Sequence, residues 1–496
     1  MNELLDSIDF DELEHQDLRE SLPLDRFLWL ESKSLENLVR EIKRDISPLI
    51  SSNRKDVAEK TDFALRILLL NLLKLEKPPL PLLLAVSKSA AAYTIKKRYS
   101  QPLLSYRTLM SVYNALMEKS YTQIVINGHW DKEKHKGEVT RISVTNKLRR
   151  LFKSHLPQNT VFFSRHKNEE IIIQKNLNKK RVEYNDTKYS RSARDNLATI
   201  NKCLTRHWYD LDLSNEGFQT FYRDWIKKRQ RKELMDSPEG LAMSNVIDFT
   251  SRSLYRVYNN GGAGAAKTNF KEGGRFYGGW WQQIPSEYRR YITINHKHTV
   301  ELDFSNLHPH MLYALVGKKL EGDAYELNNV PAEHRKYIKI AFNQLINGKG
   351  RAKIPIGFAE LGLTMSWSEL RKAVAVRHAP ISEYFNSGYG LVLQHQDSEI
   401  LERVLLHFTK NDIPCLPVHD SVIIHHHLKD ELLTTMIEAY KGTTHEDIEI
   451  DVEDNFQFFI ERYVENDTNT NDIALILQED SESIYEQRWL EWCQSK

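Results

Sequence analysis

The sequence predicts an α+β protein with more than one domain. Its 496 residues exceed the size of one ordinary domain. Apolar residues recur at helical spacing from Val57 to Leu73, which indicates a long helix. Short β-like runs at 299–302, 413–418 and 422–424 indicate a sheet in the second half of the chain. Helices and strands are therefore both expected, in a mixed arrangement.

Composition favours a globular protein with an uneven distribution of charge. Hydrophobic residues make up 41% and charged residues 28% of the chain, and the net charge is +1. Residues 1–47 hold 13 acids and 6 bases, residues 141–230 hold 9 acids and 20 bases, and residues 446–496 hold 15 acids and 3 bases. A basic middle between acidic ends suggests a polyanionic partner for the middle, although solvated helix faces would produce the same pattern.

Cysteine usage and hydropathy indicate a reducing compartment and no membrane span. The three cysteines, Cys203, Cys415 and Cys493, are far apart and form neither a disulfide framework nor a C-x-x-C pair. The first residues are acidic and lack the order of a signal peptide. The most apolar stretch, 64–86, is interrupted by charges and three prolines. We expect a cytoplasmic protein with no membrane partner.

The first 150 residues resemble an arm followed by a small helix-and-ribbon domain. We expect an acidic N-terminal arm over 1–55 and a winged-helix-like domain over 56–150. Helices are predicted from 56 to 77, from 82 to 93, and from the N-cap Ser105 to 118. Two β-like runs, 122–127 and 138–144, then form a ribbon, and the third helix would read a DNA groove. A scaffold or a docking domain for a protein partner is the alternative.

Residues 151–265 form a basic region with helices predicted at 190–208 and around 218–233. The run from Lys227 to Lys232 either follows phosphates or is a solvated helix end. Glycines at 259–264 indicate a flexible boundary.

Two aspartates carry the chemistry. Asp303 ends the β-like run 299–302, and Asp420 lies at the tip of a hairpin formed by 413–418 and 422–424. Carboxylates from two strands can hold two divalent cations about 4 Å apart, which activate a 3′-hydroxyl and stabilise a leaving pyrophosphate. Most aspartates at strand ends are only caps or turn residues.

A helix that starts near Pro331 lies between the two aspartates and carries a polar stripe. Arg335 and Lys339, four residues apart, present two cations to one side, as a triphosphate requires. Lys336, Asn343 and Asn347 share that stripe. An ordinary amphipathic surface helix explains the same spacing.

Taken in order, these elements resemble the family A polymerase superfamily, which includes bacterial family A DNA polymerases and single-subunit phage RNA polymerases. Asp303-Phe304-Ser305 resembles motif A, Arg335-xxx-Lys339 with Asn347-Gly348 resembles motif B, and Val418-His419-Asp420-Ser421 resembles motif C. Gly274-Arg275 with Gln282-Gln283-Ile284-Pro285, and Gln394 with Asp397, are similar to two further segments of the family. The resemblance covers about 270–465. Asn347 replaces a tyrosine, and Ser421 replaces the glutamate of the DNA enzymes.

This resemblance implies a right-hand polymerase (palm, fingers and thumb) preceded by the winged-helix-like domain. The thumb-like or linker region would be 151–265, the palm and fingers core 266–465, and an acidic C-terminal tail 466–496. Fingers helices would occupy 326–384. The partners implied are a DNA template-primer and dNTPs, and the oligomeric state stays open. The small size suggests a mobile-element or phage enzyme. Asp210-Leu211-Asp212 is too common a pattern to indicate a proofreading exonuclease.

The resemblance also implies roles for individual residues. Asp303 and Asp420 would bind two Mg²⁺ or Mn²⁺ ions, and Arg335 and Lys339 the triphosphate, with Lys339 a candidate acid for the pyrophosphate. Asn343 and Asn347 would lie on the nucleotide side of their helix. Contacts with the primer terminus or minor groove would come from the matching positions Arg275, Gln394 and His419. His308 stands where the DNA enzymes place a bulky gate against a ribose 2′-hydroxyl, which favours dNTPs.

Other functions remain open at this point. A single-subunit RNA polymerase or primase-like enzyme would use the same aspartates. A metal-dependent nuclease or hydrolase could use His308, His310 and His419 with the aspartates as ligands. A catalytically silent nucleic-acid-binding protein would need only the basic surfaces.

Overall fold

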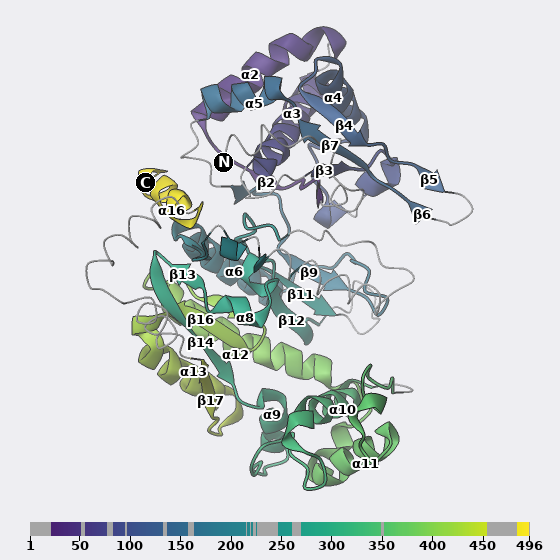
Figure 1. The fold of residues 1–496 in the computed structure, drawn as a ribbon, viewed down its shortest axis with the longest axis vertical. Helices are drawn as coiled ribbons and strands as arrows, with labels where there is room; N and C mark the ends of the chain where they lie inside the picture. The colour runs from purple at the N-terminus through teal and green to yellow at the C-terminus, as the bar shows by residue number, and fades with distance from the viewer. Residues whose placement is uncertain are drawn as a thin grey trace.

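The computed structural model describes residues 21–50, 55–76, 83–94, 97–131, 136–156, 163–214, 216–218, 220–221, 225, 247–259, 269–348, 352–453 and 484–495. Three parts follow one another along the longest axis: an N-terminal part, a central part built on sheets, and a helical lobe with α10 and α11 (Figure 1). The predicted mixture of helices and strands is confirmed. No helix among these residues is long and apolar enough to cross a membrane.

The N-terminal part is a four-stranded sheet covered by helices. Its elements are β1 (Ser21–Pro23), β2 (Leu28–Trp29), α2 (Lys33–Ile46), α3 (Lys55–Leu75), β3 (Leu83–Val86), α4 (Tyr106–Glu118), β4 (Thr122–Ile126), β5 (Trp130–Asp131), β6 (Lys136–Gly137), β7 (Thr140–Val144) and α5 (Asn146–His155). The strand order is β1-β3-β7-β4, and β5 pairs with β6 beyond the β4–β7 ribbon. A separate hydrophobic core joins α2, α3 and α4 to this sheet.

The predicted third helix begins where the sequence indicated. The side chain of Ser105 accepts a hydrogen bond from the backbone N–H of Thr108 at 3.2 Å, so it caps an N–H that lacks a partner within α4. The two β-like runs also form the expected antiparallel ribbon, β4 with β7.

The predicted helix over 82–93 is wrong. Residues 83–86 form β3, and only Ala90–Tyr93 make a single 3₁₀ turn. β3 pairs with β1 on one side and β7 on the other, and its apolar side chains are buried. A short apolar run cannot be assigned to helix or strand by periodicity alone, and here the sheet decides.

The segment expected as an acidic arm contributes to this core as far as it is described. Leu35, Leu38 and Ile42 of α2 are fully buried against α3. They recur at helical spacing, and Ser32 caps the helix. Residues 21–50 therefore pack with the N-terminal part, while 1–20 lie outside the described residues.

The central and lower parts share a second, larger core. Before them, β8 (Ser164–Arg165) still pairs with β2 of the N-terminal part. The elements of the central and lower parts are β9 (Ile172–Lys175), α6 (Lys188–Arg206), β10 (Tyr209–Leu211), β11 (Tyr255–Asn259), β12 (Glu272–Tyr277), α8 (Ser286–Arg289), β13 (Ile292–Ile294), β14 (Lys297–Phe304), α9 (Leu307–Leu315), α10 (Arg335–Asn347), α11 (Trp367–Arg377), α12 (Gly390–Thr409), β15 (Leu416–Val418), β16 (Ser421–His425), α13 (Lys429–Thr444), β17 (Ile450–Glu453) and α16 (Ile484–Ser495). The predicted helix around 218–233 and the cationic run 227–232 lie mostly or wholly outside the described residues, as does most of the boundary at 259–264.

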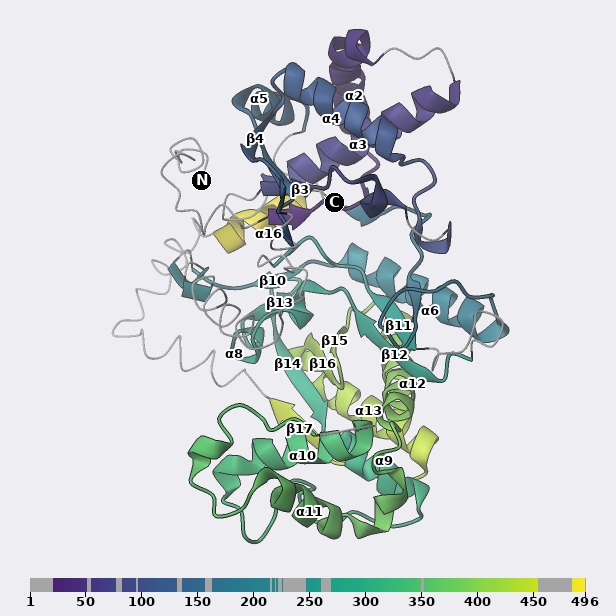
Figure 2. The same ribbon diagram turned by 90° about the vertical axis from the view of Figure 1, so that its right-hand side faces the viewer.

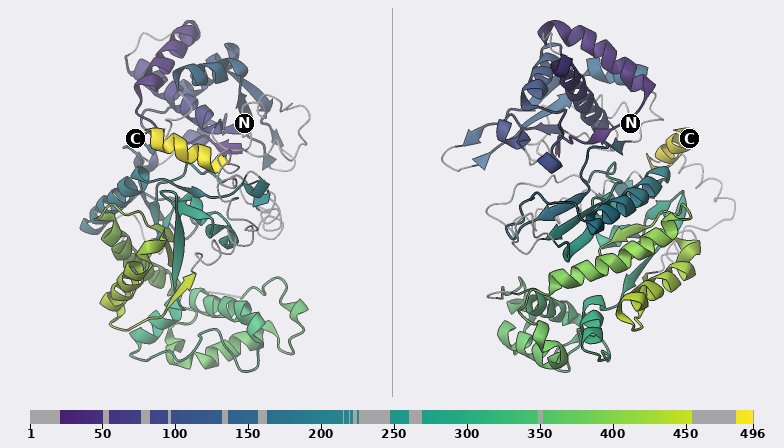
Figure 3. Two further views of the ribbon diagram at one scale, coloured as in Figure 1. Left: turned by 60° about the vertical axis from the view of Figure 1, so that its left-hand side comes forward. Right: turned by 180° about the vertical axis from the view of Figure 1, so that it is seen from behind.

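The main sheet has the order β10-β13-β14-β16-β15, and β17 also pairs with β14. β14 lies between β16 and β17 at the same residues, 301–303, so it is the centre of the sheet. A smaller sheet, β12-β11-β9, packs beside it through α12. Helices α12 and α13 run side by side, with α6 on the other side of α12 (Figure 3). In the view of Figure 2, α10 and α11 lie below the end of β14 and β17.

The described end of the acidic tail, α16, docks against β10 and β13. Trp208, Tyr485 and Trp492 form a buried aromatic cluster, and the ring of Trp489 stacks on His296 at 5.2 Å. Arg488 Nε pairs with Asp210 Oδ2 at 2.5 Å. Figure 3 shows α16 between the N-terminal part and the sheet. Asp210, from the Asp-Leu-Asp pattern, is thus held by α16.

A buried arginine fastens the smaller sheet to α12. Arg256 of β11 is fully buried, and its guanidinium donates to Glu402 and Glu399 at 2.8 Å each and to the carbonyl of Gly274 at 2.7 Å. Breaking a buried ion pair by removing one partner leaves an uncompensated charge.

We expect Arg256→Gln to lower the free energy of unfolding by about 3–5 kcal/mol in urea denaturation. The matched control is Lys441→Gln, because Lys441 pairs with Asp447 at 2.9 Å on the exposed surface. That variant should leave the free energy of unfolding nearly unchanged, because water screens an exposed ion pair. Equal effects of the two substitutions would contradict the role given to Arg256.

Candidate active site on the central sheet

The sheet register places two further aspartates beside Asp303. Asp303 of β14 lies directly opposite Ser421 of β16 and directly opposite Asp451 of β17. Directly opposed residues of antiparallel strands share one face, with Cβ atoms about 5 Å apart. Asp420 precedes Ser421 in the turn between β15 and β16. The fold therefore brings together the two aspartates that the sequence singled out and adds Asp451 beside them.

The environment of Asp303 disfavours its charge unless a cation is present. Burial, followed by the negative charges of Asp420 and Glu301, raises the pKa of Asp303 to about 7, and the positive charge of Lys339 opposes this shift. Its Oδ1 atom is buried and forms no hydrogen bond within the described residues. A buried carboxylate oxygen without a partner, next to further carboxylates, fits a hard divalent cation such as Mg²⁺.

The cationic stripe of α10 faces this site through Tyr325. Lys339 Nζ lies 5.6 Å from the Tyr325 ring centroid, and the guanidinium carbon of Arg335 lies 4.9 Å from it. Arg335 also binds Asp323 through Nε at 2.5 Å and Nη2 at 2.8 Å, and Asn306 Oδ1 at 3.2 Å. Lys339 has no carboxylate within ion-pair distance in the described part of the chain, and its charge acts on Asp303.

The other two polar residues of the stripe lie farther along α10. Asn343 and Asn347 follow Lys339 by one and two turns, about 6 and 12 Å along the axis. Asn347 Nδ2 donates to the carbonyl of Asn343 at 2.9 Å. The Oδ1 atom of Asn347 packs directly against Gly390, and a Cβ atom at position 390 would lie only 1.8 Å from this oxygen. The structure thus seats Asn347 against the start of α12 and does not bring it to Asp303.

Arg275 and His308 share one buried carboxylate. Asp397 of α12 is only 3% exposed. It accepts hydrogen bonds from Arg275 Nε at 3.0 Å, and its Oδ2 lies 2.8 Å from His308 Nε2. Burial lowers the pKa of Arg275, but the charge and hydrogen bond of Asp397, followed by the charge of Asp420, raise it above its usual value. Arg275 and His308 therefore lie together at the Asp420 side of the site.

A glycine makes this arrangement possible. Gly274 has a φ of +101°, and a Cβ there would lie 2.7 Å from the Tyr258 ring and 2.9 Å from Ser398 Oγ of α12. Only glycine lets β12 approach α12 this closely without strain. The close approach carries the next residue, Arg275, within reach of Asp397.

The remaining predicted residues are His419 and Gln394. His419, at the β15–β16 turn, adopts a φ of +58°, and its ring meets Tyr277 edge to face at 6.5 Å. Such a backbone is uncommon outside glycine and is typical of strained site residues. Gln394 lies on α12, three residues before Asp397.

The sequence analysis gave no role in the site to four acidic residues that the structure places there: Glu301, Asp323, Asp397 and Asp451. Glu301 binds Arg289 at 2.7 Å and accepts the hydroxyl hydrogen bond of Ser421 at 2.5 Å. Its place two residues before Asp303 on a strand was a usable signal, because both then face the same side. Asp451 gave no such signal, since its position depends on the register of β17.

A cavity of about 700 Å³ opens beside these residues. Its polar lining includes Ser305, Asn306, Lys318, Lys319, Asp323, Arg335, Glu449 and Asp451. Its volume lies in the range typical of small-molecule sites. Cations and carboxylates therefore line one opening, which reaches the site through Asp451, the residue opposite Asp303, although Asp303, Asp420 and Lys339 do not line it.

No protein-family model and no curated protein matches this chain. Among solved structures 38 chains match. One is the POL domain of Pol1 from M. smegmatis, solved in complex with a DNA primer-template and dNTP. It is 13% identical with a TM-score of 0.22, and the match covers 31% of this chain and 38% of that chain. The chain thus spans less than half of that structure, and so low a TM-score does not establish a shared fold.

The raised pKa of Asp303 predicts a pH-dependent stability in the absence of divalent cations. Its folded pKa of about 7 exceeds the usual unfolded value, so ionisation favours the unfolded state between roughly pH 4 and pH 7. The cost is absent below about pH 4 and complete above about pH 7. We expect Asp303→Asn to raise the free energy of unfolding by about 1–3 kcal/mol at pH 8 and not at pH 4.

Urea denaturation in chelator at both pH values measures this effect. Asp195→Asn is the control, because Asp195 is exposed on α6. An Asp303→Asn variant that is less stable than the parent at pH 8 would contradict the electrostatic description.

Proposed function

We propose that the protein is a template-directed nucleotidyltransferase, most specifically a DNA polymerase that adds dNTPs to a 3′-hydroxyl. One observation carries the proposal: Asp420, in the turn that leads into β16, acts electrostatically on Asp303 of the neighbouring strand β14, and the positive charge of Lys339 acts on Asp303 as well. A site of this kind stabilises the charge that develops on a transferring phosphoryl group.

Two Mg²⁺ or Mn²⁺ ions fit the donor set. Asp303 and Asp420 would hold them, and the buried, unpartnered Oδ1 of Asp303 supports this assignment. When bound, such ions lower the pKa of the attacking hydroxyl and stabilise the leaving pyrophosphate oxygen. Glu301 would remain a positioning residue, because Arg289 and Ser421 already occupy its oxygens.

Lys339 and Arg335 would bind the triphosphate beside Asp303, and Arg335 also lines the neighbouring cavity. Lys339 is the direct candidate, since it carries no ion pair with the described residues, and it can also donate a proton to the pyrophosphate. Arg335 would exchange its bonds to Asp323 for phosphate oxygens. Both pairings are bidentate and charge-assisted, so the exchange costs little.

Arg275, His308, Gln394 and His419 would contact the primer terminus and the sugar of the incoming nucleotide. The shared carboxylate Asp397 fixes Arg275 and His308 in one geometry. A bulky, fixed imidazole suits exclusion of a 2′-hydroxyl. Asn343 and Asn347 would act at a distance from the phosphates, as supports of α10 against α12.

The architecture that goes with this function has a palm, fingers and a thumb. The main sheet would be the palm, α10 and α11 the fingers, and the α6 region within 151–265 the thumb. The N-terminal part would be a winged-helix-like domain with α4 as its reading helix, supported by the strand order β3-β7-β4 and the β4–β7 ribbon. It would hold DNA or a protein partner.

A primer-extension assay with Mg²⁺ or Mn²⁺ tests the proposal, with dNTPs and NTPs offered separately on DNA and RNA templates. We expect Asp420→Asn to lower nucleotide incorporation about a thousandfold or more, because several kcal/mol of transition-state stabilisation are lost. Asp430→Asn, an exposed change on α13, is the control and should retain activity. Release of nucleotides from DNA with no synthesis would instead identify a nuclease, and full incorporation by Asp420→Asn would refute the mechanism.

His308 should set the choice of sugar. We expect His308→Ala to reduce the preference for dNTPs over NTPs about tenfold or more, since pocket-volume discrimination is typically worth about 1–3 kcal/mol. The ratio of kcat/KM for dATP and ATP measures this, with His407→Ala on exposed α12 surface as control. An unchanged ratio, or a parent enzyme that prefers NTPs, would remove His308 from sugar selection and favour the RNA polymerase alternative.

A further inference from the structure

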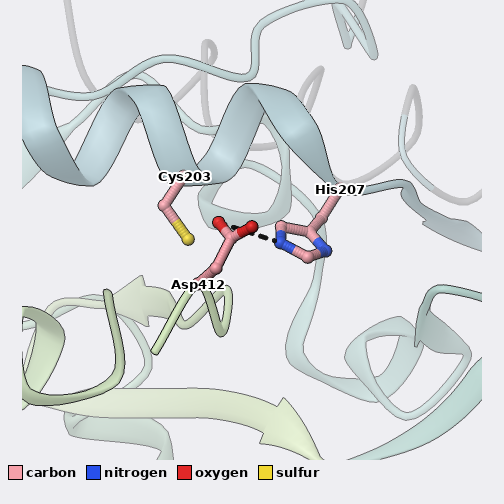
Figure 4. Close-up of side chains that lie close together, drawn as sticks. All are labelled: Cys203, His207 and Asp412. Carbon is pink, nitrogen blue, oxygen red and sulfur yellow. Dashed lines mark ion pairs between the residues drawn. The ribbon is translucent and has the colours of Figure 1, made fainter. Parts of the chain in front are cut away.

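Three metal-ligating side chains meet away from the aspartates of the sheet. Cys203 lies on α6, and His207 follows the last residue of that helix. Both side chains turn toward Asp412 (Figure 4). Asp412 reaches them from the turn between α12 and β15 (Figure 4). Each contributes one donor atom, and these atoms all lie within 4.8 Å of one another.

The three donor residues differ in their exposure to solvent. Cys203 is 1% exposed, whereas the side chain of Asp412 is 48% exposed. His207 Nε2 is buried, forms no hydrogen bond within the described residues, and lies 3.4 Å from Asp412 Oδ1. The cluster is thus closed on the protein side and open to solvent at Asp412. An ion can enter there, and water can complete its coordination.

We propose that Cys203, His207 and Asp412 bind one Zn²⁺ ion. A thiolate, an imidazole and a carboxylate are the donor types that zinc uses, in tetrahedral sites with donor distances of about 2.0–2.3 Å. Such distances bring the donors closer together than 4.8 Å, and a side-chain adjustment of about 1 Å satisfies them. Mg²⁺ disfavours a thiolate, so this site differs in chemistry from the one at Asp303.

Two neighbours must adjust when zinc binds. Arg206 Nη2 holds Asp412 Oδ1 at 2.5 Å, and this is the oxygen that lies 3.4 Å from His207 Nε2, so the ion pair with Arg206 must shift for the carboxylate to bind the metal. Asn295 Nδ2 lies 3.0 Å from His207 Nδ1. A metal on Nε2 leaves the ring proton on Nδ1, so the Asn295 amide must turn to present its oxygen. The metal would then fasten α6 to the turn that leads into β15 and the Asp420 hairpin.

Metal content and cobalt spectroscopy on the full chain test the site. Protein dialysed against ZnCl₂ should retain about one zinc per chain. Replacement by Co²⁺ should produce a thiolate-to-cobalt charge-transfer band. Cys203→Ser should abolish the band, and Asp412→Asn should weaken zinc binding about tenfold or more in chelator competition. Asp412 is at the surface, so this second variant keeps the test valid if Cys203→Ser fails to fold.

The controls separate this site from other cysteines and from the proposed polymerase site. Cys493→Ser, on exposed α16 surface, should leave zinc content and the cobalt band unchanged. Asp303→Asn should also leave them unchanged while activity is lost, so failure of one proposal does not imply failure of the other. A parent protein with no retained zinc and no cobalt band overturns the inference. A cobalt band that persists in Cys203→Ser would also overturn it. The same holds for a band that is lost in Cys415→Ser but not in Cys203→Ser.

Discussion

The register between β14 and β16 is the constraint on which the site depends. Because Asp303 is paired with Ser421, the residue before Ser421 is carried to the same end of the sheet. A shift by one residue would turn Asp303 to the other face and separate it from Asp420. Pairing with β17 adds a third carboxylate opposite Asp303. Like charges placed directly opposite one another destabilise a sheet, so this register is costly unless positive charge compensates it.

Nearby arginines supply part of this positive charge. Arg289 neutralises Glu301, Arg275 pairs with Asp397, and Arg335 pairs with Asp323. Asp303 has no such partner among the described residues, and only the more distant Lys339 offsets its charge. Asp397, Glu301 and Asp323 therefore each have their own cation, whereas Asp303, Asp420 and Asp451 form no ion pair within the described residues. Functional sites are where such unbalanced charges are expected to persist.

Much of this arrangement was predictable from local patterns. Ser105 predicted the start of α4, apolar spacing predicted α3, and the strand ends at Asp303 and Asp420 predicted the pair of carboxylates. The stripe of α10 predicted that Arg335 and Lys339 face one side. These features depend on residues close in sequence, where helix and strand periodicity carry the information.

Other features depend on contacts between distant segments, which no local pattern encodes. β3 became a strand because β1 and β7 flank it, although its residues also suit a helix. Asp397 could be noticed near Gln394, but its bonds to Arg275 and His308 depend on how β12 and α9 pack on α12. The cluster of Cys203, His207 and Asp412 joins residues more than 200 positions apart, and the cysteine spacing, which contains no C-x-x-C pair, did not point to it.

Anomalous X-ray diffraction at the manganese edge tests the shared-cation account most directly, on crystals soaked with MnCl₂ and a non-hydrolysable dNTP. The account predicts anomalous density between the carboxylates of Asp303 and Asp420, with the triphosphate oriented toward Lys339. Manganese bound elsewhere but not there, or carboxylates turned away from each other, would contradict it.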